Sequence, residues 1–441
     1  MITFKGGVHP PEFKELSRGK KIEKMPAPKE VIIPLSQHTG SPAKPLLGPN
    51  DKVKVGTKIG EAVGKISVPV HSSVSGTIKE LRHYPHPVLP KPVLSYVIEN
   101  DGEEVIDESI KKRENYLSLS NEELLNIIKE AGIVGLGGAA FPTHIKLSPP
   151  PEYKIDTLII NGAECEPFLT ADERLMQERP EDIVEGARII AKILKVSQVI
   201  FAIEENKPEA VKEIEKASRN LEGSKVVVLK TKYPQGAEKQ LIKAVLDREV
   251  PRGGLPFMVG VLVQNVGTSV AIYEAVKEGK PLYERVVTIT GPGIKDPKNV
   301  LVRIGTKLAD VIEYAGGYKE DRVEIISGGP MMGIAQPTED TMVIKGTSGI
   351  LVLKEPEKIY PESSCIRCAS CVEVCPMGLV PTELVRYAQR DKFDLAEEWG
   401  ILDCMECGSC AYVCPSHIRM VQWIKYAKNE IFKKKARSGK K

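Results

Sequence analysis

The sequence predicts a multidomain α/β protein with a central parallel-sheet domain. Three observations support this. The chain has 441 residues, of which 41% are hydrophobic and 27% charged, enough for three or more soluble domains. Apolar runs alternate with helical segments over 115–280, a pattern typical of a parallel sheet covered by helices. Short β-like runs lie on both sides of that region, and eight of the nine cysteines follow near the C-terminus.

The first 100 residues are predicted to be an arm followed by a β domain. Residues 1–29 are rich in Lys and Pro and indicate an extended arm. Residues 30–100 contain short β-like runs broken by Gly, Pro and Asn. Within them, 55–60 and 69–78 resemble a lipoyl-like barrel-sandwich domain. The Met-flanked lysine of true carriers is missing, so a structural or docking role is expected.

The parallel-sheet domain is predicted over 115–280. Ser120 has the character of an N-cap, with Glu123 three residues later, so a helix is expected over 121–131. Three continuous apolar runs predict buried strands: 157–160, 199–203 and 226–229. Helices are expected between them over 183–194 and 208–218.

Two smaller modules are predicted to follow. Short strands and glycine pairs over 285–345, with a helix at 307–314, indicate a β-grasp-like module. Residues 361–428 carry the cysteines with helical segments between them, which favours a helical domain. The basic end, 429–441, is either a solvated disordered tail or a contact for a membrane surface or acidic partner.

The cysteines form two identical runs with the spacing C-x2-C-x2-C-x3-C-P. This spacing is typical of two [4Fe–4S] clusters, and the fourth cysteine of each run binds the other cluster. One predicted set is Cys365, Cys368, Cys371 and Cys414. The other is Cys404, Cys407, Cys410 and Cys375. Tetrahedral zinc is the competing interpretation, and disulfides are less favoured because nothing indicates export.

Charge and hydropathy exclude several classes of function. The net charge of +3 indicates no bulk affinity for nucleic acid. No run of 18 apolar residues predicts a membrane-spanning helix, and the N-terminus lacks the apolar core of a signal peptide. These features together favour a cytosolic location.

A glycine-rich loop, 132–146, is the second chemical signal. Its glycines let the backbone approach a planar or phosphorylated ligand, although a structural turn is equally compatible. Three polar segments follow predicted strands: 161–167, 233–238 and 264–268. Ligands in open α/β sheets lie at the carboxyl ends of strands, so these segments are candidates for a binding site. Helix caps and turns are the alternative.

The order of these segments resembles the NADH- and FMN-binding subunit of respiratory complex I. More closely, it resembles the RnfC family, the C subunits of Rnf electron-transport complexes. The cysteine runs, the stretch 139–146 and the N-terminal 6–11 carry the resemblance. It covers nearly the whole chain. It implies a barrel-sandwich, a flavin domain, an SLBB-type β-grasp module and a dicluster ferredoxin domain, in this order.

The resemblance also implies the cofactor-binding residues. These are Gly135, Gly137, Gly138, Phe141, Lys146, Asn161, Glu164, Glu166, Gly236, Glu238, Asn265 and Thr268. By this mapping Asn161 and Glu164 contact FMN, Glu166 lies near NADH, and Phe141 stacks on the adenine. Leu136 stands where the complex I loop has Arg, which leaves the binding of flavin or pyrophosphate open. Cys165, outside the two runs, is expected to be an inert buried residue rather than a ligand.

The implied function is that of an electron-input subunit. It would pass electrons between NAD(H), FMN and two [4Fe–4S] clusters, in the ferredoxin:NAD⁺ oxidoreductase activity of an ion-translocating Rnf complex. Its partners would be other Rnf subunits, especially an iron–sulfur subunit, at the cytoplasmic face of the cell membrane. No side chain is expected to act as general acid or base. The alternatives are a soluble NADH-dependent cobalamin (corrin) reductase and a cluster relay or docking subunit without functional flavin.

Overall fold

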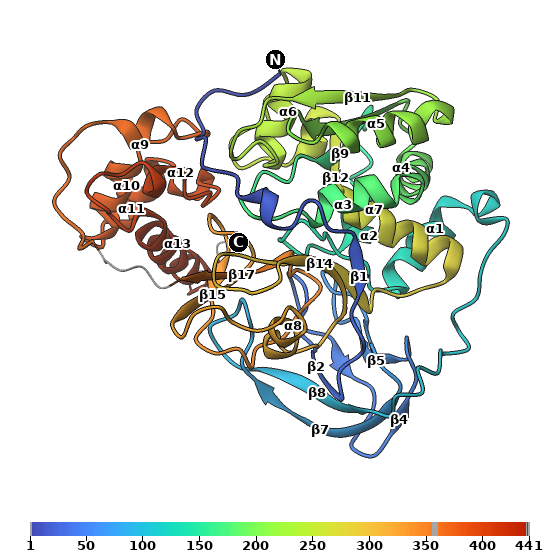
Figure 1. Ribbon diagram of the computed structural model, residues 1–441. Helices are drawn as coiled ribbons and strands as arrows, with labels where there is room; N and C mark the ends of the chain where they lie inside the picture. The colour runs from blue at the N-terminus through green and yellow to red at the C-terminus, as the bar shows by residue number, and fades with distance from the viewer. Residues whose placement is uncertain (1, 355–359, 438, 440–441) are drawn as a thin grey trace.

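The computed structural model describes residues 2–354, 360–437 and 439. Figure 1 shows the β domain at the bottom, the parallel-sheet domain at the upper right and a second sheet module between them. The cysteine-bearing helical domain, called the cluster domain below, lies at the left. The multidomain α/β class predicted from the sequence is confirmed.

The β domain consists of two small sheets around one core. The four-stranded sheet has the order β2 (Glu30–Pro34), β8 (Val93–Asn100), β7 (Gly76–Tyr84), β4 (Lys52–Val53). The second has β3 (Lys44–Pro45), β5 (Lys58–Glu61) and β6 (Val70–His71). Val31, Ile59 and Tyr96 from different strands are buried together. This is the predicted barrel-sandwich.

The central sheet is parallel and has the order β11 (Ser224–Leu229), β10 (Gln198–Glu204), β9 (Thr157–Gly162), β12 (Val261–Asn265). From β9 the chain proceeds through β10 to β11 on one side, and β12 then returns to the other side of β9. The order therefore reverses between β9 and β12. A ligand crevice is expected outside the carboxyl ends of strands at such a switch point.

Helices cover both faces of this sheet (Figure 1). They are α1 (Asn121–Glu130), α2 (Thr143–Lys146), α3 (Ala171–Glu178), α4 (Pro180–Leu194), α5 (Pro208–Ala217), α6 (Glu238–Leu246) and α7 (Val266–Tyr273). The predicted capping box of α1 is present, with Ser120 and Glu123 each bonded to the other's backbone N–H. Helices α4 and α7 pack closely because Gly186 has no side chain: a Cβ there would lie 2.0 Å from the Ser269 carbonyl oxygen.

The β-grasp sheet reaches beyond the predicted limits of 285–345. Its order is β1 (Ile22–Lys24), β14 (Lys298–Arg303), β13 (Glu284–Thr290), β17 (Gly349–Lys354), β15 (Val323–Ser327), β16 (Ile334–Ala335), with helix α8 (Leu308–Tyr314). The edge strand β1 comes from the predicted arm, and β17 is central. Both belong to the sheet through pairing between distant segments, which local sequence patterns do not report.

The N-terminal segment is extended but packed along most of its length. Figure 1 shows it passing between the cluster domain and the parallel-sheet domain before it reaches β1. Ile2 forms a bridge with Leu229, at the end of β11, and Val8 forms one with Tyr233. The Gly7 N–H also donates to the Val374 carbonyl in the cluster domain, at 2.8 Å. The segment therefore joins three parts of the molecule.

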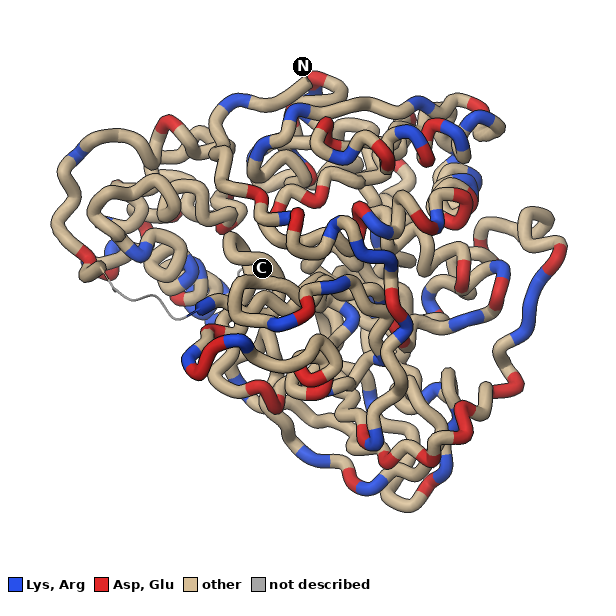
Figure 2. Tube along the Cα trace, in the orientation of Figure 1, with Lys and Arg blue, Asp and Glu red and all other residues tan. Residues whose placement is uncertain are grey.

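The cluster domain is helical, as predicted, with α9 (Ser370–Glu373), α10 (Pro381–Ala388), α11 (Phe393–Glu398), α12 (Ser409–Tyr412) and α13 (Met420–Arg437). The prediction of a separate tail over 429–441 is wrong for 429–437, which continue α13; Lys440 and Lys441 lie outside the described residues. Ile431 is buried, and Lys434 forms an ion pair with Asp394 of α11. Figure 2 shows the basic residues along α13. Across the described residues, every helix is too short or too polar to cross a membrane.

Lys345 joins three domains behind the glycine-rich loop. Its Nζ donates to the carbonyls of Pro69 (3.0 Å) in the β domain and Gly132 (2.7 Å) at the start of the loop. Its backbone N–H donates to the Gln37 side chain at 3.1 Å. The side chain is fully buried, and this burial lowers the pKa of Lys345 to about 7.

This pKa predicts a pH-dependent contribution to stability. Between about pH 7 and the ordinary value of 10.5, the unfolded state binds a proton at Lys345 that the folded state does not bind. The free energy of unfolding should therefore rise with pH in this window, by about 1 kcal/mol per pH unit, relative to a Lys345→Met variant. Denaturation of both proteins at pH 7 and pH 9 measures this. The exposed Lys225→Met is the control, and a constant difference between wild type and Lys345→Met would contradict the assignment.

Candidate functional site

A cleft of about 390 Å³ opens at the carboxyl ends of β9 and β12, where the strand order reverses. This volume is typical of a cofactor site. The residues predicted from the sequence that line it are Gly135, Gly137, Phe141, Lys146, Asn161, Glu164, Glu166, Gly236, Glu238 and Asn265. The structure thus gathers segments separated by more than a hundred residues. Of the other two predicted residues, Thr268 anchors the loop and Gly138 adopts a left-handed backbone, with φ of 110°.

The glycine-rich loop is fixed to the N-terminus of α7. The Leu136 N–H donates to Thr268 Oγ1 at 2.9 Å. Asn265 caps the helix, because its Oδ1 accepts the Thr268 N–H at 3.2 Å. Gly137 lies beside Asn265 in the lining of the cleft, and a Cβ built on Gly137 would lie 3.6 Å from the Asn265 Cβ. Backbone amides and the positive end of a helix dipole therefore face one space, which suits an anionic ligand.

The Glu164 carboxylate caps helix α3. It accepts the N–H groups of Asp172 at 2.7 Å and Glu173 at 3.1 Å. Burial raises the pKa of Glu164, and the nearby Lys14 ammonium opposes this increase. The contact between Glu164 and FMN that the resemblance implies stays a prediction.

The Glu166 carboxylate binds the loop between β15 and β16. Its oxygens accept the N–H groups of Met331 at 3.0 Å and Met332 at 2.8 Å. Burial raises the pKa of Glu166 to about 7, against the effect of these two amides. Glu166 therefore fastens the β-grasp module to the cleft, and its placement near NADH stays a prediction.

Polar contacts also hold the opposite wall of the cleft. Asn161 Nδ2 donates to the Gly236 carbonyl at 2.8 Å, and Lys146 forms a 2.6 Å ion pair with Glu238. The Gly236 N–H donates to Cys165 Sγ at 3.3 Å. Burial raises the pKa of Cys165 to about 12, so this thiol stays protonated at neutral pH.

Sequence analysis missed several residues that line the cleft from other parts of the chain. They are Asp172, Arg285, Met332 and Met405. Met405 lies within the second cysteine run, the other three belong to no recognisable motif, and only the tertiary fold brings all four here. Two buried atoms of the lining, Gln264 Oε1 and Thr143 Oγ1, have no hydrogen-bond partner among the described residues. Unpartnered polar atoms, loop amides and a buried arginine fit a phosphorylated flavin with its own donors and acceptors.

Within each predicted set of cysteines, thiols lie near enough to influence one another's pKa, and the assignment of the two sets to two clusters stays a prediction. Burial raises the pKa of Cys371, and the thiols of Cys414, Cys365 and Cys368 add to the increase. Burial likewise raises the pKa of Cys404 to about 11, with Cys407 and Cys375 contributing. Through residues 2–354, 360–437 and 439, no three His, Cys, Asp or Glu side chains are placed to hold a single metal ion.

The two cysteine runs also share a backbone conformation. Arg367 and Glu406 occupy equivalent positions and both have φ of 60°. Their N–H groups donate to Cys365 Sγ and Cys404 Sγ, each at 3.4 Å. Such bonds to sulfur tune the potential of iron–sulfur clusters. An all-thiol donor set with N–H···S bonds fits two [4Fe–4S] clusters.

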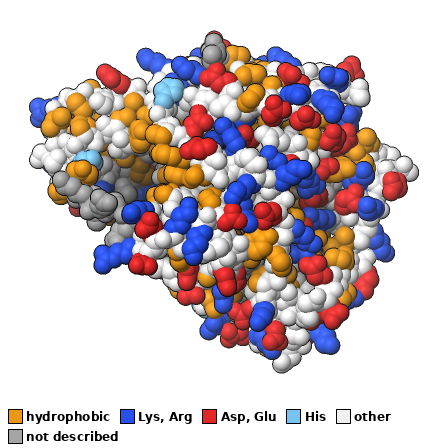
Figure 3. Space-filling model, in the orientation of Figure 1, with side chains coloured by type: hydrophobic (Ala, Val, Ile, Leu, Met, Phe, Trp, Pro, Cys, Tyr) orange, Lys and Arg blue, Asp and Glu red, His pale blue; other side chains and the backbone are white. Residues whose placement is uncertain are grey.

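One cysteine set lies directly behind the cleft. Tyr233 lines the cleft, and its Oη donates to the Cys407 carbonyl at 2.7 Å. Val8, Tyr233 and Cys407 form a buried apolar cluster, against which Cys165 and Met405 pack. Figure 3 shows hydrophobic side chains gathered where the cluster domain meets the rest of the molecule.

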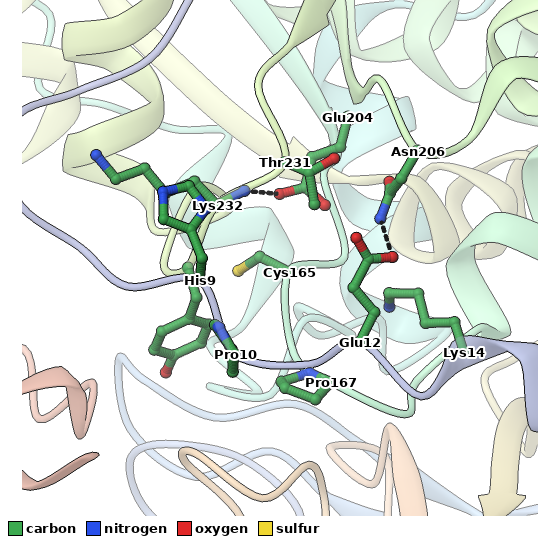
Figure 4. A pocket seen from close by; sticks show the side chains of 11 residues that line it. His9, Pro10, Glu12, Lys14, Cys165, Pro167, Glu204, Asn206, Thr231 and Lys232 are labelled. Carbon is green, nitrogen blue, oxygen red and sulfur yellow. Dashed lines mark hydrogen bonds between the residues drawn. The ribbon is translucent and has the colours of Figure 1, made fainter. Parts of the chain in front are cut away.

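A second cavity, of about 140 Å³, lies on the other side of Cys165 (Figure 4). The N-terminal segment covers it with His9, Glu12 and Lys14. Asn206 Nδ2 donates to the Glu12 carboxylate at 2.7 Å. Cys165 and Tyr233 line both cavities and form the wall between them.

Comparisons with known sequences give the same order of domains. The RnfC barrel sandwich hybrid domain matches residues 2–103, and the Nuo51 FMN-binding domain matches 128–274. The SLBB domain matches 286–335, and the 4Fe-4S dicluster domain matches 357–415. These matches favour iron–sulfur clusters over zinc. The chain's cofactors are FMN and two [4Fe–4S] clusters.

Whole-chain relatives identify the family. The C subunit of the proton-translocating ferredoxin:NAD⁺ oxidoreductase complex of Clostridium ljungdahlii is 50% identical, over 91% of this chain and 88% of its own. The chain belongs to the RnfC family. The C subunit of the Na⁺-translocating complex of Acetobacterium woodii is 45% identical, over 91% of this chain and 90% of its own. The resemblance found in the sequence is confirmed.

A solved structure shares the fold. An NAD⁺-reducing [NiFe]-hydrogenase in the H2-reduced state superposes with a TM-score of 0.50 at 17% identity, covering 75% of this chain and 69% of that one. At this identity the likeness concerns the fold alone.

We predict that Gly137→Val prevents FMN binding without unfolding the protein. A Cβ at this position makes ordinary contacts and the backbone is unstrained, so the larger side chain fills the cleft rather than disturbing the core. The unfolding free energy should change by less than about 1 kcal/mol. Flavin content and iron content of the purified variant measure the result. Gly137→Ala should lose less flavin, and a Gly137→Val protein with full flavin content would show that FMN binds elsewhere.

We predict that Tyr233→Phe loosens the contact between the cleft and the cluster domain. The substitution removes the hydrogen bond from the Tyr233 hydroxyl and leaves the buried Cys407 carbonyl without that donor. The loss should destabilise this contact by about 1–3 kcal/mol. Hydrogen exchange in peptides spanning 404–410 should become faster. Tyr426→Phe, which removes an exposed bond to Asp391 within the cluster domain, is the control. Equal protection in wild type and Tyr233→Phe would refute the role of this contact.

Proposed function

We propose that this chain is the electron-input subunit of an ion-translocating ferredoxin:NAD⁺ oxidoreductase (Rnf) complex. It passes electrons between NAD(H), FMN and two [4Fe–4S] clusters. The observation that carries the proposal is the wall shared by the cleft and one cysteine set. Tyr233 and Met405 line the cleft; Tyr233 belongs to a buried apolar cluster with Cys407, and Met405 packs against that cluster. A site for a two-electron cofactor thus adjoins a site for one-electron cofactors.

The protein's own residues bind and position the cofactors. The loop at Gly135–Gly138, the N-terminus of α7 and the polar side chains of the cleft would hold FMN. FMN supplies the conversion between hydride transfer and single-electron transfer. No side chain of the cleft needs to act as general acid or base for this chemistry.

The two cysteine sets would act in a fixed order. The set of Cys375, Cys404, Cys407 and Cys410 adjoins the cleft; Cys407 and Cys410 are buried, and none of the four is exposed. In the other set, Cys365 and Cys368 are exposed, and the neighbouring Ile366 is 67% exposed. We therefore place the second set at the exit, where an iron–sulfur subunit of the complex would exchange electrons. The chain would lie at the cytoplasmic face of the cell membrane as a peripheral subunit.

We predict about eight irons per anaerobically purified chain, because each set holds a four-iron cluster. Cys407→Ser and Cys368→Ser should each lower the iron and labile sulfide content by about half. With FMN and NADH added, the cluster left in Cys368→Ser should be reduced as fast as in wild type. The cluster left in Cys407→Ser should be reduced more slowly, because the set nearest the cleft is lost. Electron paramagnetic resonance after rapid freezing separates the two cases.

Two results would oppose the proposal. Stoichiometric zinc without labile sulfide in the purified protein would show that the cysteines bind zinc and not iron–sulfur clusters. Absence of NADH-driven reduction in wild type loaded with FMN would favour a docking or relay subunit. If the two cysteine variants exchanged behaviour, the order of the sets would be reversed while the function stood.

A further inference from the structure

Arg285, on strand β13, is a buried cation beside the cleft. Its side chain is 7% exposed and lines the cleft together with Gly135 and Leu136. Each hydrogen bond of the guanidinium goes to a backbone carbonyl: Nε to Val286 at 3.3 Å, Nη1 to Lys345, and Nη2 to Leu136 at 3.3 Å. Within the part of the chain that the structure describes, no carboxylate forms an ion pair with it.

A buried charge without an ion pair is unfavourable, and it is normally neutralised or matched by an opposite charge. The neighbouring Lys345 can lose its proton, since burial lowers its pKa to about 7. Arg285 keeps its charge at neutral pH, because burial lowers its pKa only to about 10 and Asp172 opposes the decrease. The positive charge of Arg285 therefore lacks an ion-pair partner among the described residues.

Asp172 is the acidic group that acts on Arg285, but it is already engaged. Its carboxylate accepts a hydrogen bond from Asn265 Nδ2 at 2.7 Å. Burial raises the pKa of Asp172. A ligand anion in the cleft would meet the guanidinium, the loop amides and the N-terminus of α7 together.

We propose that Arg285 binds the phosphate of FMN and supplies a guanidinium that the loop itself lacks, since the loop of this chain has Leu136 and no arginine. The loop and the arginine are in contact through the Leu136 carbonyl, so a guanidinium from β13 reaches the same part of the cleft. Arginine suits this role because its planar fork binds phosphate oxygens in pairs. The inference rests on the proposed function, in that the cleft must bind FMN.

The assignment makes FMN binding dependent on two domains. Arg285 belongs to the β-grasp sheet, whereas the loop and α7 belong to the parallel-sheet domain. The phosphate would therefore bridge the two domains. Riboflavin, which has the same ring but no phosphate, would lack this contact.

The experiment compares FMN and riboflavin binding to flavin-depleted full-length protein by quenching of flavin fluorescence. Arg285→Met should weaken FMN binding about ten- to hundredfold, as expected for loss of a charged hydrogen-bond partner, and change riboflavin binding little. Arg285→Lys, which keeps the charge without the fork, should fall between. Leu136→Arg added to Arg285→Met should restore part of the preference for FMN.

Arg303→Met is the matched control. Arg303 is equally buried on the adjacent strand β14, forms an ion pair with Glu284 and does not line the cleft. Loss of the Arg303 side chain should leave the ratio of FMN affinity to riboflavin affinity unchanged. The inference is overturned if Arg285→Met weakens both flavins equally, which would indicate a structural role, or if wild type does not distinguish them. Wild type that binds neither flavin would instead remove the proposed function itself.

Discussion

The hydrogen bond between Tyr233 and Cys407 connects the cleft to the cluster domain, and the function of the molecule depends on this connection. It places one cysteine set against the wall of the cleft. Tyr233 lines the cleft, and its hydroxyl binds the Cys407 carbonyl. The N-terminal segment completes this contact, because Val8 bridges to Tyr233 and Gly7 donates to Val374 beside the cysteines. A left-handed glycine is required at position 7, where φ is 78° and a Cβ would lie 2.5 Å from the Tyr233 carbonyl oxygen. The first ten residues therefore position two redox sites that lie far from them in sequence.

Buried cationic side chains lie at the other junctions between domains. They differ in how their buried positive charge is balanced or lost. Lys14 donates to the carbonyls of Glu164 and Glu166 at 2.9 and 3.1 Å, and burial lowers its pKa while Glu164 opposes this. Lys345 also binds carbonyls and can become neutral. Arg285 cannot, since a guanidinium loses its proton only at high pH. Carbonyl groups accept hydrogen bonds from all three side chains, but only a ligand anion would match the remaining charge of Arg285.

Local patterns in the sequence predicted those parts of the structure that local interactions decide. The capping box at Ser120 and the strands of the central sheet are present where the pattern placed them. The missed features depend on distant segments. Strand β1 joins the β-grasp sheet from the arm, and Arg285 reaches the cleft from a segment without a motif. The prediction of a tail at the basic end was wrong because it rested on charge alone. Residues up to Arg437 continue α13, and Ile431 on this helix is buried.

A second connection links the cleft to the cluster domain alongside Tyr233. Glu166 binds the N–H groups of Met331 and Met332, so the loop between β15 and β16 lies over the cleft. Met331 in turn abuts Gly408, where a Cβ would lie 3.0 Å from the Met331 carbonyl oxygen and φ is 81°. Gly408 immediately follows Cys407. The same cysteine set is thus held from two sides, by the parallel-sheet domain through Tyr233 and by the β-grasp module through Met331. The geometry of this junction therefore depends on the packing of three domains against one another.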